Sequence, residues 1–395
     1  MERGDVETVR EFNKLLDVLR RVRKKIVERS LEKEEIDKKL IEKLQKILVK
    51  LKSIPENGKG YILFAGGNER VVMSLDYEIE SIRKDLIYLK QGEKGFKEYL
   101  RRKNENFDNE VKEIVEYLEG KTFDSFISDR DGALNEFSDR YTSSIQSTYN
   151  AVFLEKFLSK FKNKIILTSA PLKDLRYVNI FPENDTIFAG SRGRQFVYEG
   201  KKKNFYVPWK EGKKLGIVSR KIKALLREDK YRKLKYLGSG LQEKFGGITV
   251  ARQNHLDSVD KRISKDFLEE IKEIVKSVDP KGEYFDIKDT GLDIQVNLKW
   301  GMKVFDKGSG LGFILNSLNK NLSHTLVCGN SESDLRMVEK AKNLSDEISV
   351  IFVTESESLK SKVRSVLPNA KFVSHPDNLV FALKQSSSKI RKSKI

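Results

Sequence analysis

The sequence has little of the chemistry that builds disulfides, zinc sites or membrane spans. Its 395 residues include one cysteine and three histidines, so the chain cannot close a disulfide on itself and offers no set of ligands at zinc-site spacing. No apolar run approaches the roughly 20 residues of a membrane-spanning helix. The N-terminus opens with charged residues instead of the apolar stretch of a secretory signal. These absences predict a cytoplasmic protein that does not bind a membrane.

Positive charge is abundant but is mostly balanced locally. The formal net charge is +18, yet most lysines and arginines alternate with acidic residues, as in 32–39. Only 201–203 and 389–394 are nearly pure positive charge. We interpret the first as a solvated surface and the second as part of a basic tail at 389–395. No recognised nucleic-acid readout motif accompanies them, so we expect no nucleic-acid partner.

The first 120 residues repeat apolar side chains every three or four positions, which indicates amphipathic helices. Turn-forming residues at 55–58 end the first pair of helices, and a glycine-containing connection follows at 66–67. We expect residues 1–120 to form an antiparallel helical bundle or coiled coil, a module for packing, self-association or binding a protein partner. The apolar repeats lie in 5–53, 79–89 and 111–118.

Beyond Phe123 the pattern changes to short apolar runs that end in small polar residues. Helical stretches separate most of these runs, which is typical of a parallel sheet with crossover helices. In such a sheet the ligand lies at the carboxyl ends of the strands. We therefore expect an α/β fold with a Rossmann-like parallel-sheet core formed by 121–194 and 301–388. The runs are 126–129, 165–168, 186–190, 325–329 and 348–353.

Residues 195–300 interrupt this pattern with two alternating strand candidates, 248–252 and 293–298. Helical segments at 212–228 and 260–278 lie around and between them. The stretch predicts an inserted α+β cap over the active edge of the parallel sheet, with hinges where the chain passes between core and cap. Those crossings are expected at 191–196 and 299–303.

Two carboxylates separated by one residue follow the first strand of the core, in Asp129-Arg130-Asp131-Gly132. A carboxylate nucleophile suits phosphoryl transfer because it can form an aspartyl-phosphate and split one difficult hydrolysis into two easier steps. The neighbouring carboxyl can protonate the leaving oxygen and later deprotonate water. On its own the motif is weak evidence, since two acids before a glycine are also a common turn.

Three further elements arrive in order at strand or helix ends. Thr168 ends the second apolar run, where its hydroxyl can hold a phosphoryl oxygen. Lys307 opens a helix after the cap, where a cation can neutralise the nucleophile and the phosphoryl group. Asn330 and Asp334 follow a strand and place oxygen ligands where Mg²⁺ requires them. Singly each has an ordinary structural explanation, but together they predict a Mg²⁺-dependent phosphohydrolase.

These motifs resemble those of the haloacid dehalogenase superfamily, with the cap inserted between the second and third motifs. The closer resemblance is to trehalose-6-phosphate phosphatases of the nematode and actinobacterial type. It covers roughly 123–380, and the helical N-terminal domain matches the nematode arrangement in architecture. The stretches that carry it are 123–132, 167–172, 188–194, 238–244, 307–308 and 327–338.

The resemblance implies hydrolysis of trehalose 6-phosphate, with Asp129 as nucleophile and Asp131 as general acid and base. It also implies that Asp129, the carbonyl of Asp131 and the last motif, with Asn330 and Asp334, hold Mg²⁺. Thr168 and Lys307 complete the implied catalytic set.

The resemblance further implies that polar cap residues bind the sugar: Gln242, Lys244, Arg252 and Asp293. Each of these has an ordinary surface role as its alternative. Arg192 and Arg194 lie beside the expected crevice, where they could attract an anionic substrate or form surface ion pairs.

One departure from the family pattern concerns the metal. Asn330 stands where the family usually has aspartate, which makes the site less anionic and should weaken cation binding. Two alternatives stay open, the first because the cap residues that set specificity are weakly diagnostic and the second because of Asn330. The chain could be a phosphatase for another glycosyl phosphate, or a catalytically weakened binding or regulatory protein.

Overall fold

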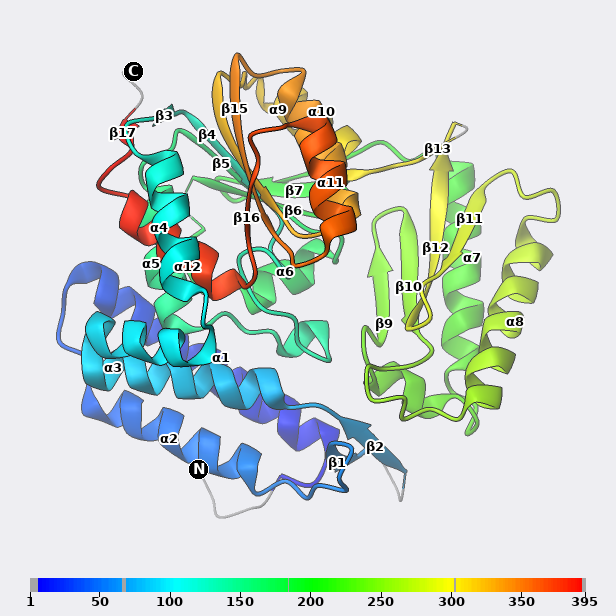
Figure 1. The fold of residues 1–395 in the computed structure, drawn as a ribbon. Helices are drawn as coiled ribbons and strands as arrows, with labels where there is room; N and C mark the ends of the chain where they lie inside the picture. Colours follow the sequence, from blue (N-terminus) through cyan, green and yellow to red (C-terminus); the bar gives the residue numbers. More distant parts are fainter. Residues whose placement is uncertain (1–5, 66–68, 184, 302, 393–395) are drawn as a thin grey trace.

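The computed structural model describes residues 6–65, 69–183, 185–301 and 303–392. Figure 1 shows three parts: an N-terminal group of helices, a central sheet with helices on both faces, and a smaller cap beside it. No helix in the described ranges has the length and apolar character that crossing a bilayer requires.

The N-terminal part contains three of the expected helices and one hairpin that was not expected. Thr8 caps the first helix, since its hydroxyl accepts a hydrogen bond from the amide of Glu11 at 3.2 Å. The third helix bends at Gly92, whose φ is 67°. The glycines at 66–67 lie outside the described residues, but the strands on either side pair with each other. In chain order the elements are α1 (Val9–Glu32), α2 (Lys38–Lys52), β1 (Tyr61–Phe64), β2 (Arg70–Met73) and α3 (Asp76–Lys103).

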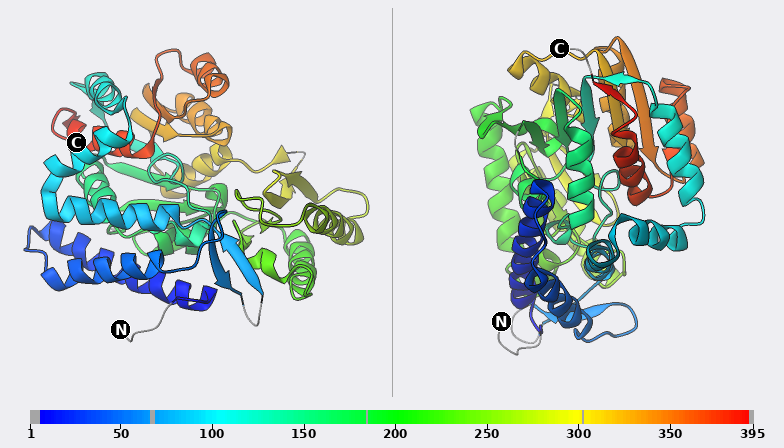
Figure 2. Two further views of the ribbon diagram at one scale, coloured as in Figure 1. Left: turned by 60° about the horizontal axis from the view of Figure 1, so that its bottom comes forward. Right: turned by 90° about the vertical axis from the view of Figure 1, so that its left-hand side faces the viewer.

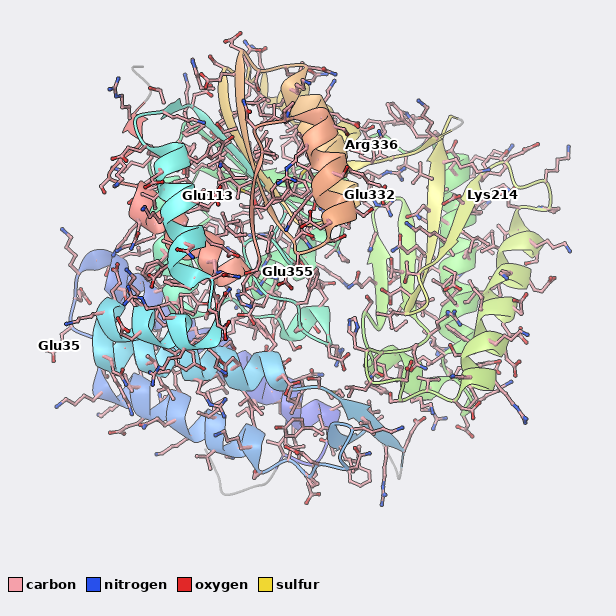
Figure 3. The ribbon with its side chains drawn as sticks, viewed as in Figure 1. Glu35, Glu113, Lys214, Glu332, Arg336 and Glu355 are labelled. Atoms are coloured by element: carbon pink, nitrogen blue, oxygen red, sulfur yellow. The ribbon has the colours of Figure 1, made fainter. Side chains whose placement is uncertain are left out.

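The fourth helix, α4 (Phe107–Leu118), does not join this bundle. Its Phe107 ring meets Phe381 of α12 (Pro376–Ser386) edge-on at 5.2 Å. Its Glu113, labelled in Figure 3, pairs with Lys371 of β16 (Lys371–Val373) at 2.7 Å. The sequence pattern identified the helix correctly but assigned it to the wrong neighbour, because amphipathic periodicity does not say which surface the apolar face covers.

The central sheet has eight strands, of which the six from β16 to β6 run parallel and the last two run antiparallel. All five predicted core strands are present. Their order across the sheet is β16, β15 (Glu347–Val353), β14 (His324–Gly329), β4 (Ser125–Ser128), β5 (Asn163–Leu167), β6 (Thr186–Gly190), β7 (Gln195–Tyr198) and β8 (Lys201–Asn204).

Apolar side chains on both faces of the sheet explain why these strands are continuous apolar runs. Phe126 and Ile166 belong to the cluster that also contains residues of α5 and α12, whereas Ile127 and Ile165 belong to the cluster with residues of α9, α10 and α11. The sheet is therefore covered on both sides. The crossover helices are α5 (Thr148–Leu158), α6 (Leu172–Val178), α9 (Lys307–Leu318), α10 (Leu335–Lys342) and α11 (Glu357–Val366).

Two expected boundaries differ from the structure. Strands β7 and β8 extend the core sheet, so the cap begins after residue 204 and not at 195. The lysines 201–203 form its exposed edge strand, where charge discourages pairing with another chain. The expected basic tail also begins inside the fold, because β17 (Arg391–Lys392) pairs with β3 (Thr122–Phe123).

The cap is an antiparallel sheet in the order β11, β12, β10, β9, with two helices on one face (Figure 1). Side chains that alternate along its strands divide into an apolar face, with Ile248, Val250 and Ile294, and a polar face, with Gln242 and Gln295. The elements are α7 (Trp209–Leu225), β9 (Leu241–Lys244), β10 (Gly247–Ala251), α8 (Lys261–Val278), β11 (Phe285–Asp289), β12 (Asp293–Trp300) and β13 (Lys303–Val304).

The N-terminal part contacts both other parts. Helix α1 lies beside α5 of the core, and the hairpin extends toward the cap (Figure 2). Toward the open end of the hairpin, away from its turn, the side-chain amide of Asn254 of the cap donates to the carbonyl of Val72 at 2.9 Å. The N-terminal part therefore packs on the core through its helices and contacts the cap through its hairpin.

Candidate active site

Asp129 lies at the carboxyl end of β4, in the middle of the parallel sheet. One carboxylate oxygen accepts a hydrogen bond from the amide of Arg130 at 2.7 Å, and the other lies 2.8 Å from the ammonium of Lys307. Lys307 is the first residue of α9, a helix that Asp306 caps by accepting from the amide of Ser309 at 2.7 Å. The strand end and the helix start thus fix the acid and the cation against each other.

Both groups are buried, and burial dominates their electrostatics. Burial raises the pKa of Asp129 to about 7, with nearby carboxylates adding to the effect and Lys307 opposing it. Burial alone would lower the pKa of Lys307, but Asp129 and Asp334 raise it above its ordinary value. Lys307 is therefore a permanent positive charge beside Asp129.

Asp131 lies two residues on, in the turn that follows the strand. It forms an ion pair with Arg130, and the hydroxyl of Thr168 donates to its other oxygen at 3.5 Å. Gly132 has φ of 83°, and a Cβ there would lie 2.2 Å from the side-chain nitrogen of Asn330. Only glycine fits this turn, which brings Asp129, Asp131, Thr168 and Asn330 together as the sequence predicted.

In the last motif, Asp334 has a structural role, whereas Asn330 has a side-chain oxygen that is available to a ligand. Asp334 is fully buried, and both its oxygens are occupied: one lies 2.6 Å from the ammonium of Lys307, and the other accepts from the amides of Asn330 and Ser331, each at 3.0 Å. The expected role of Asp334 as a metal ligand is therefore not what its contacts support. It anchors the loop and the lysine instead.

Asn330 has the opposite character. Its side-chain oxygen is buried and has no hydrogen-bond partner among the described residues. An unpaired buried oxygen is costly unless a ligand satisfies it. The Asn330 side chain lies against Gly132, in the turn that carries Asp129 and Asp131, so these residues fit a hard cation such as Mg²⁺, which prefers oxygen ligands.

The chain does not cross into the cap at the expected hinge, 191–196, because β7 and β8 continue the core sheet to residue 204; this segment is a core turn that is bonded tightly to the cap. Ser191 and Arg192 both adopt left-handed backbone, with φ of 54° and 60°. The guanidinium of Arg192 donates to the side chain of Gln295 at 3.0 Å, and that of Arg194 donates to the carbonyls of Gly246 and Leu298, each at 3.0 Å. Both arginines therefore hold the cap in place, and the other expected crossing contains residue 302, which lies outside the described ranges.

A cavity of about 240 Å³ separates Asp131 from the cap. Asp293 lines its far wall, where Ser239 donates to its carboxylate at 2.9 Å. Burial raises the pKa of Asp293 above its ordinary value. The cavity places a polar cap wall opposite the acid that would protonate a leaving group. Its other lining residues include Phe137, Tyr141, Ser144, Gln253, Asn254 and His255.

Of the four predicted cap residues, three share the polar face of the cap sheet. Gln242 and Lys244 alternate along β9, and Asp293 begins β12 in register with Ala251. Burial, followed by the nearby charge of Arg192, lowers the pKa of Lys244 to about 7.

Arg252 does not join them. It follows Ala251 and so points to the opposite face, where its guanidinium donates to both oxygens of Asp289 at 2.8 and 2.9 Å. A third bond, of 3.0 Å, reaches Ser264 on α8. The structure thus gives Arg252 a role inside the cap, away from the cavity.

Sequence reasoning missed Arg130 and the loop residues that line the cavity. Arg130 is buried, and its guanidinium donates to the Ser144 hydroxyl at 2.9 Å while pairing with Asp131. An arginine between the two predicted catalytic aspartates was a signal, because burying a guanidinium is costly without an anionic partner. Tyr141 and Ser144 gave no comparable signal, since a loop has no periodicity to predict its direction.

Comparison with known families decides the assignment. A family model described as the C-terminal part of trehalose-6-phosphate phosphatase matches residues 126–379. The chain belongs to the trehalose-6-phosphate phosphatase family. A second model of this family, the N-terminal helical bundle domain, matches residues 8–107. The predicted family membership and the helical N-terminal domain are thereby confirmed.

Relatives of known name agree with this membership. The chain is 29% identical to the Caenorhabditis elegans alpha,alpha-trehalose-phosphate synthase (UDP-forming) 2, over 97% of the chain and 34% of that protein. It is 29% identical to the trehalose-phosphatase of Brugia malayi, over 71% of the chain and 62% of that protein. The chain thus spans about a third of the first of these relatives.

A solved structure titled as a trehalose-6-phosphate phosphatase related protein aligns with 67% of the chain and 97% of its own length. The TM-score is 0.47 and the identity 15%.

Proposed function

We propose that the chain hydrolyses trehalose 6-phosphate to trehalose and inorganic phosphate. The observation that carries this proposal is the pairing of Asp129 with Lys307, 2.8 Å apart, at the floor of a crevice that the polar face of the cap covers. Family membership over 126–379 supplies the substrate. The cytoplasmic location, and any partner of the N-terminal helices, stay predictions.

In the first step a carboxylate oxygen of Asp129 attacks phosphorus. The bond between phosphorus and the sugar oxygen breaks, and Asp131, which must enter this step protonated although it pairs with Arg130 in the structure, gives its proton to that oxygen, so that trehalose leaves neutral. Lys307 offsets the negative charge that Asp129 and the phosphoryl group bring together. The hydroxyl of Thr168 binds a phosphoryl oxygen and keeps Asp131 turned toward the leaving group.

In the second step water attacks the phosphorus of the aspartyl-phosphate. Asp131 now takes a proton from the water, the bond between phosphorus and Asp129 breaks, and inorganic phosphate forms. The proton returns Asp131 to its starting state. Each residue therefore ends the cycle as it began, and water is the only co-reactant.

Asp129, the Asp131 carbonyl and Asn330 are the residues that would hold Mg²⁺. When bound, Mg²⁺ would supply positive charge that favours the ionised nucleophile and balances the phosphoryl oxygens. Asp334 supports this set from behind through the amide of Asn330, at 3.0 Å. With asparagine in place of aspartate, we expect the cation to be held weakly enough that excess Mg²⁺ is needed for full activity.

The sugar lies in the cavity of about 240 Å³ between Asp131 and the cap. Asp293 lines this cavity, and Gln242 and Lys244 lie on the same face of the cap sheet, which suits hydroxyl recognition. Arg192 approaches from the core turn between β6 and β7.

The test is phosphate release from trehalose 6-phosphate by the purified chain, with Mg²⁺ and with a chelator. We expect release with the metal and a loss of at least about a thousandfold in Asp129→Asn, because the amide cannot form the covalent intermediate. Metal-dependent release from other disaccharide phosphates but not from this one would instead favour the alternative of another glycosyl phosphate.

The variant Asn330→Asp distinguishes an active phosphatase from the remaining alternative, a catalytically weakened binding or regulatory protein. If Asn330 merely weakens metal binding, the aspartate variant should reach the same maximal rate at about tenfold lower Mg²⁺. If wild type is inactive at every Mg²⁺ concentration and Asn330→Asp restores turnover, the natural chain is a binding or regulatory protein.

A further inference from the structure

The segment 144–148 of the core lies between the N-terminal helices and the catalytic turn. It links the 3₁₀ turn at Tyr141–Ser143 to the start of α5. Every residue in it is buried. The segment receives hydrogen bonds from both sides, and these bonds connect the N-terminal domain to Asp131.

From the N-terminal side, the segment is held by an ion pair that is entirely buried. Arg23 of α1 and Asp85 of α3 lie 2.7 Å apart, and both side chains have no exposed surface. The guanidinium of Arg23 donates a further bond to the carbonyl of Ile145 at 2.7 Å and a third to the hydroxyl of Ser81 at 2.9 Å.

The second oxygen of Asp85 reaches the same segment one turn later. It accepts from the amide of Thr148 at 2.6 Å and from the Thr148 hydroxyl at 2.7 Å. The hydroxyl of Tyr77, also on α3, lies 2.9 Å from the carbonyl of Ile145 and 3.1 Å from the side-chain oxygen of Asn135. The backbone carbonyl of Asn135 in turn accepts from the amide of Gly132 at 2.7 Å, which closes the catalytic turn.

From the catalytic side, Ser144 holds Arg130 with two bonds. One guanidinium nitrogen donates to the Ser144 hydroxyl at 2.9 Å and the other donates to its carbonyl. The same guanidinium pairs with Asp131. The series therefore runs from Arg23 and Asp85 through the segment to Arg130 and then to the acid.

We propose that the N-terminal helical domain positions Asp131 for proton transfer, through the Arg23–Asp85 pair, the segment 144–148 and Arg130. This inference rests on the proposed function, because it needs Asp131 to act as the acid. It gives the helical domain a part in catalysis. Arg23, Tyr77, Asp85 and Thr148 are positioning residues, since none of them touches the reacting atoms.

Physical chemistry favours this role over simple attachment of two domains. A fully buried ion pair contributes little net stability over an apolar contact, but it tolerates few geometries. Proton transfer is sensitive to geometry on the scale of an ångström. A rigid, directional support therefore suits an acid better than an apolar interface would. If the N-terminal helices only had to attach to the core, a buried ion pair would not be needed at this boundary.

The test exploits the leaving group. A sugar alkoxide needs a proton from Asp131, whereas p-nitrophenolate leaves readily without one. The first step can be followed for p-nitrophenyl phosphate as a burst of p-nitrophenolate. For trehalose 6-phosphate it can be followed as single-turnover cleavage with excess enzyme.

Tyr77→Phe and Thr148→Val each remove one hydroxyl of the series at nearly constant volume. We expect each to slow sugar-phosphate cleavage about tenfold, with KM within about twofold, while the p-nitrophenolate burst stays within about twofold of wild type. Thr148→Ser, which keeps the hydroxyl, should restore the rate.

Tyr177→Phe is the matched control. It removes a hydrogen bond of 2.5 Å between α6 and Asp17 of α1, at the same domain boundary but outside the series. This variant should leave the rates on both substrates unchanged. Equal losses on the two substrates, or no loss in Tyr77→Phe, Thr148→Val and Ser144→Ala alike, would overturn the proposal.

Failure of the proposed function would give a different result. Wild type would then show the p-nitrophenolate burst without cleaving trehalose 6-phosphate, and the variants would be compared on whichever sugar phosphate the wild type cleaves. If a variant fails to fold by circular dichroism, Ser144→Ala tests the last link from the catalytic side.

Discussion

At the scale of single residues, Lys244 carries the clearest pH dependence. Burial and the charge of Arg192 lower its pKa to about 7, so it is protonated below that pH and neutral above it. An anionic substrate binds more tightly to the protonated form. We therefore predict that kcat/KM falls about tenfold per pH unit above about pH 7, because kcat/KM reports groups of the free enzyme. Initial rates between about pH 5 and about pH 9 measure this fall, the alkaline limb of the pH profile of kcat/KM.

Lys244→Arg is the control for that assignment, since a guanidinium stays protonated over the whole range. The alkaline limb should move upward by at least about two pH units in this variant. A limb that stays near pH 7 in Lys244→Arg would show that another group titrates. Phosphate esters lose their second proton near pH 6, so the acid limb should be the same in both proteins.

At the scale of elements, the sequence predicted the core strands better than it predicted what packs around them. The five core runs were recognisable because both faces of the parallel sheet are buried, and Asp129 and Asp131 followed from their place at a strand end. Two things were not accessible. The hairpin β1–β2 has only four residues in each strand, too few for a reliable alternation. The support of Asp131 depends on contacts between residues over a hundred positions apart, such as Arg23 and Ile145.

The alternation of side chains along β10 could have corrected the prediction that Arg252 binds the substrate. In a strand where Thr249 and Ala251 face the core, the next residue must face the cap helices. The prediction that follows compares the two faces of the cap sheet. Arg252→Met should lower the melting temperature by a few degrees, a loss of about 1 kcal/mol because the pair with Asp289 is partly exposed. It should leave KM unchanged.

Gln242→Ala, on the other face, should show the reverse. Gln242 is buried on the polar face of the cap sheet, and its neutral amide cannot form an ion pair that the substitution would remove. We expect KM for trehalose 6-phosphate to rise about tenfold with little change in melting temperature. Thermal unfolding and initial rates on the two variants decide the matter. A raised KM in Arg252→Met would return that residue to the substrate site.

At the scale of the whole molecule, the N-terminal hairpin joins parts that must move relative to each other. Asn254 of the cap donates to Val72 of β2 at 2.9 Å, and the amide of Ser74 donates to Asp139 of the core at 3.2 Å. If the cap opens to admit substrate, the contact between Asn254 and the hairpin must break. A substrate that favours the closed state should therefore stabilise the hairpin as well as the cap, because the contact between them is formed in that state and its population rises.

Hydrogen exchange can detect this coupling in the Asp129→Asn variant, which should bind substrate without consuming it. We predict that trehalose 6-phosphate slows exchange of the amides of 70–74 and of 254–258, because each lies beside the contact that closure maintains. Amides of α2, which packs on α1 and α3 away from the cap, serve as the internal reference and should not change. Slower exchange around the cavity with no change at 70–74 would mean that the cap closes independently of the N-terminal domain. In that case the domain would act on catalysis only through the fixed core, by way of the segment that holds Arg130.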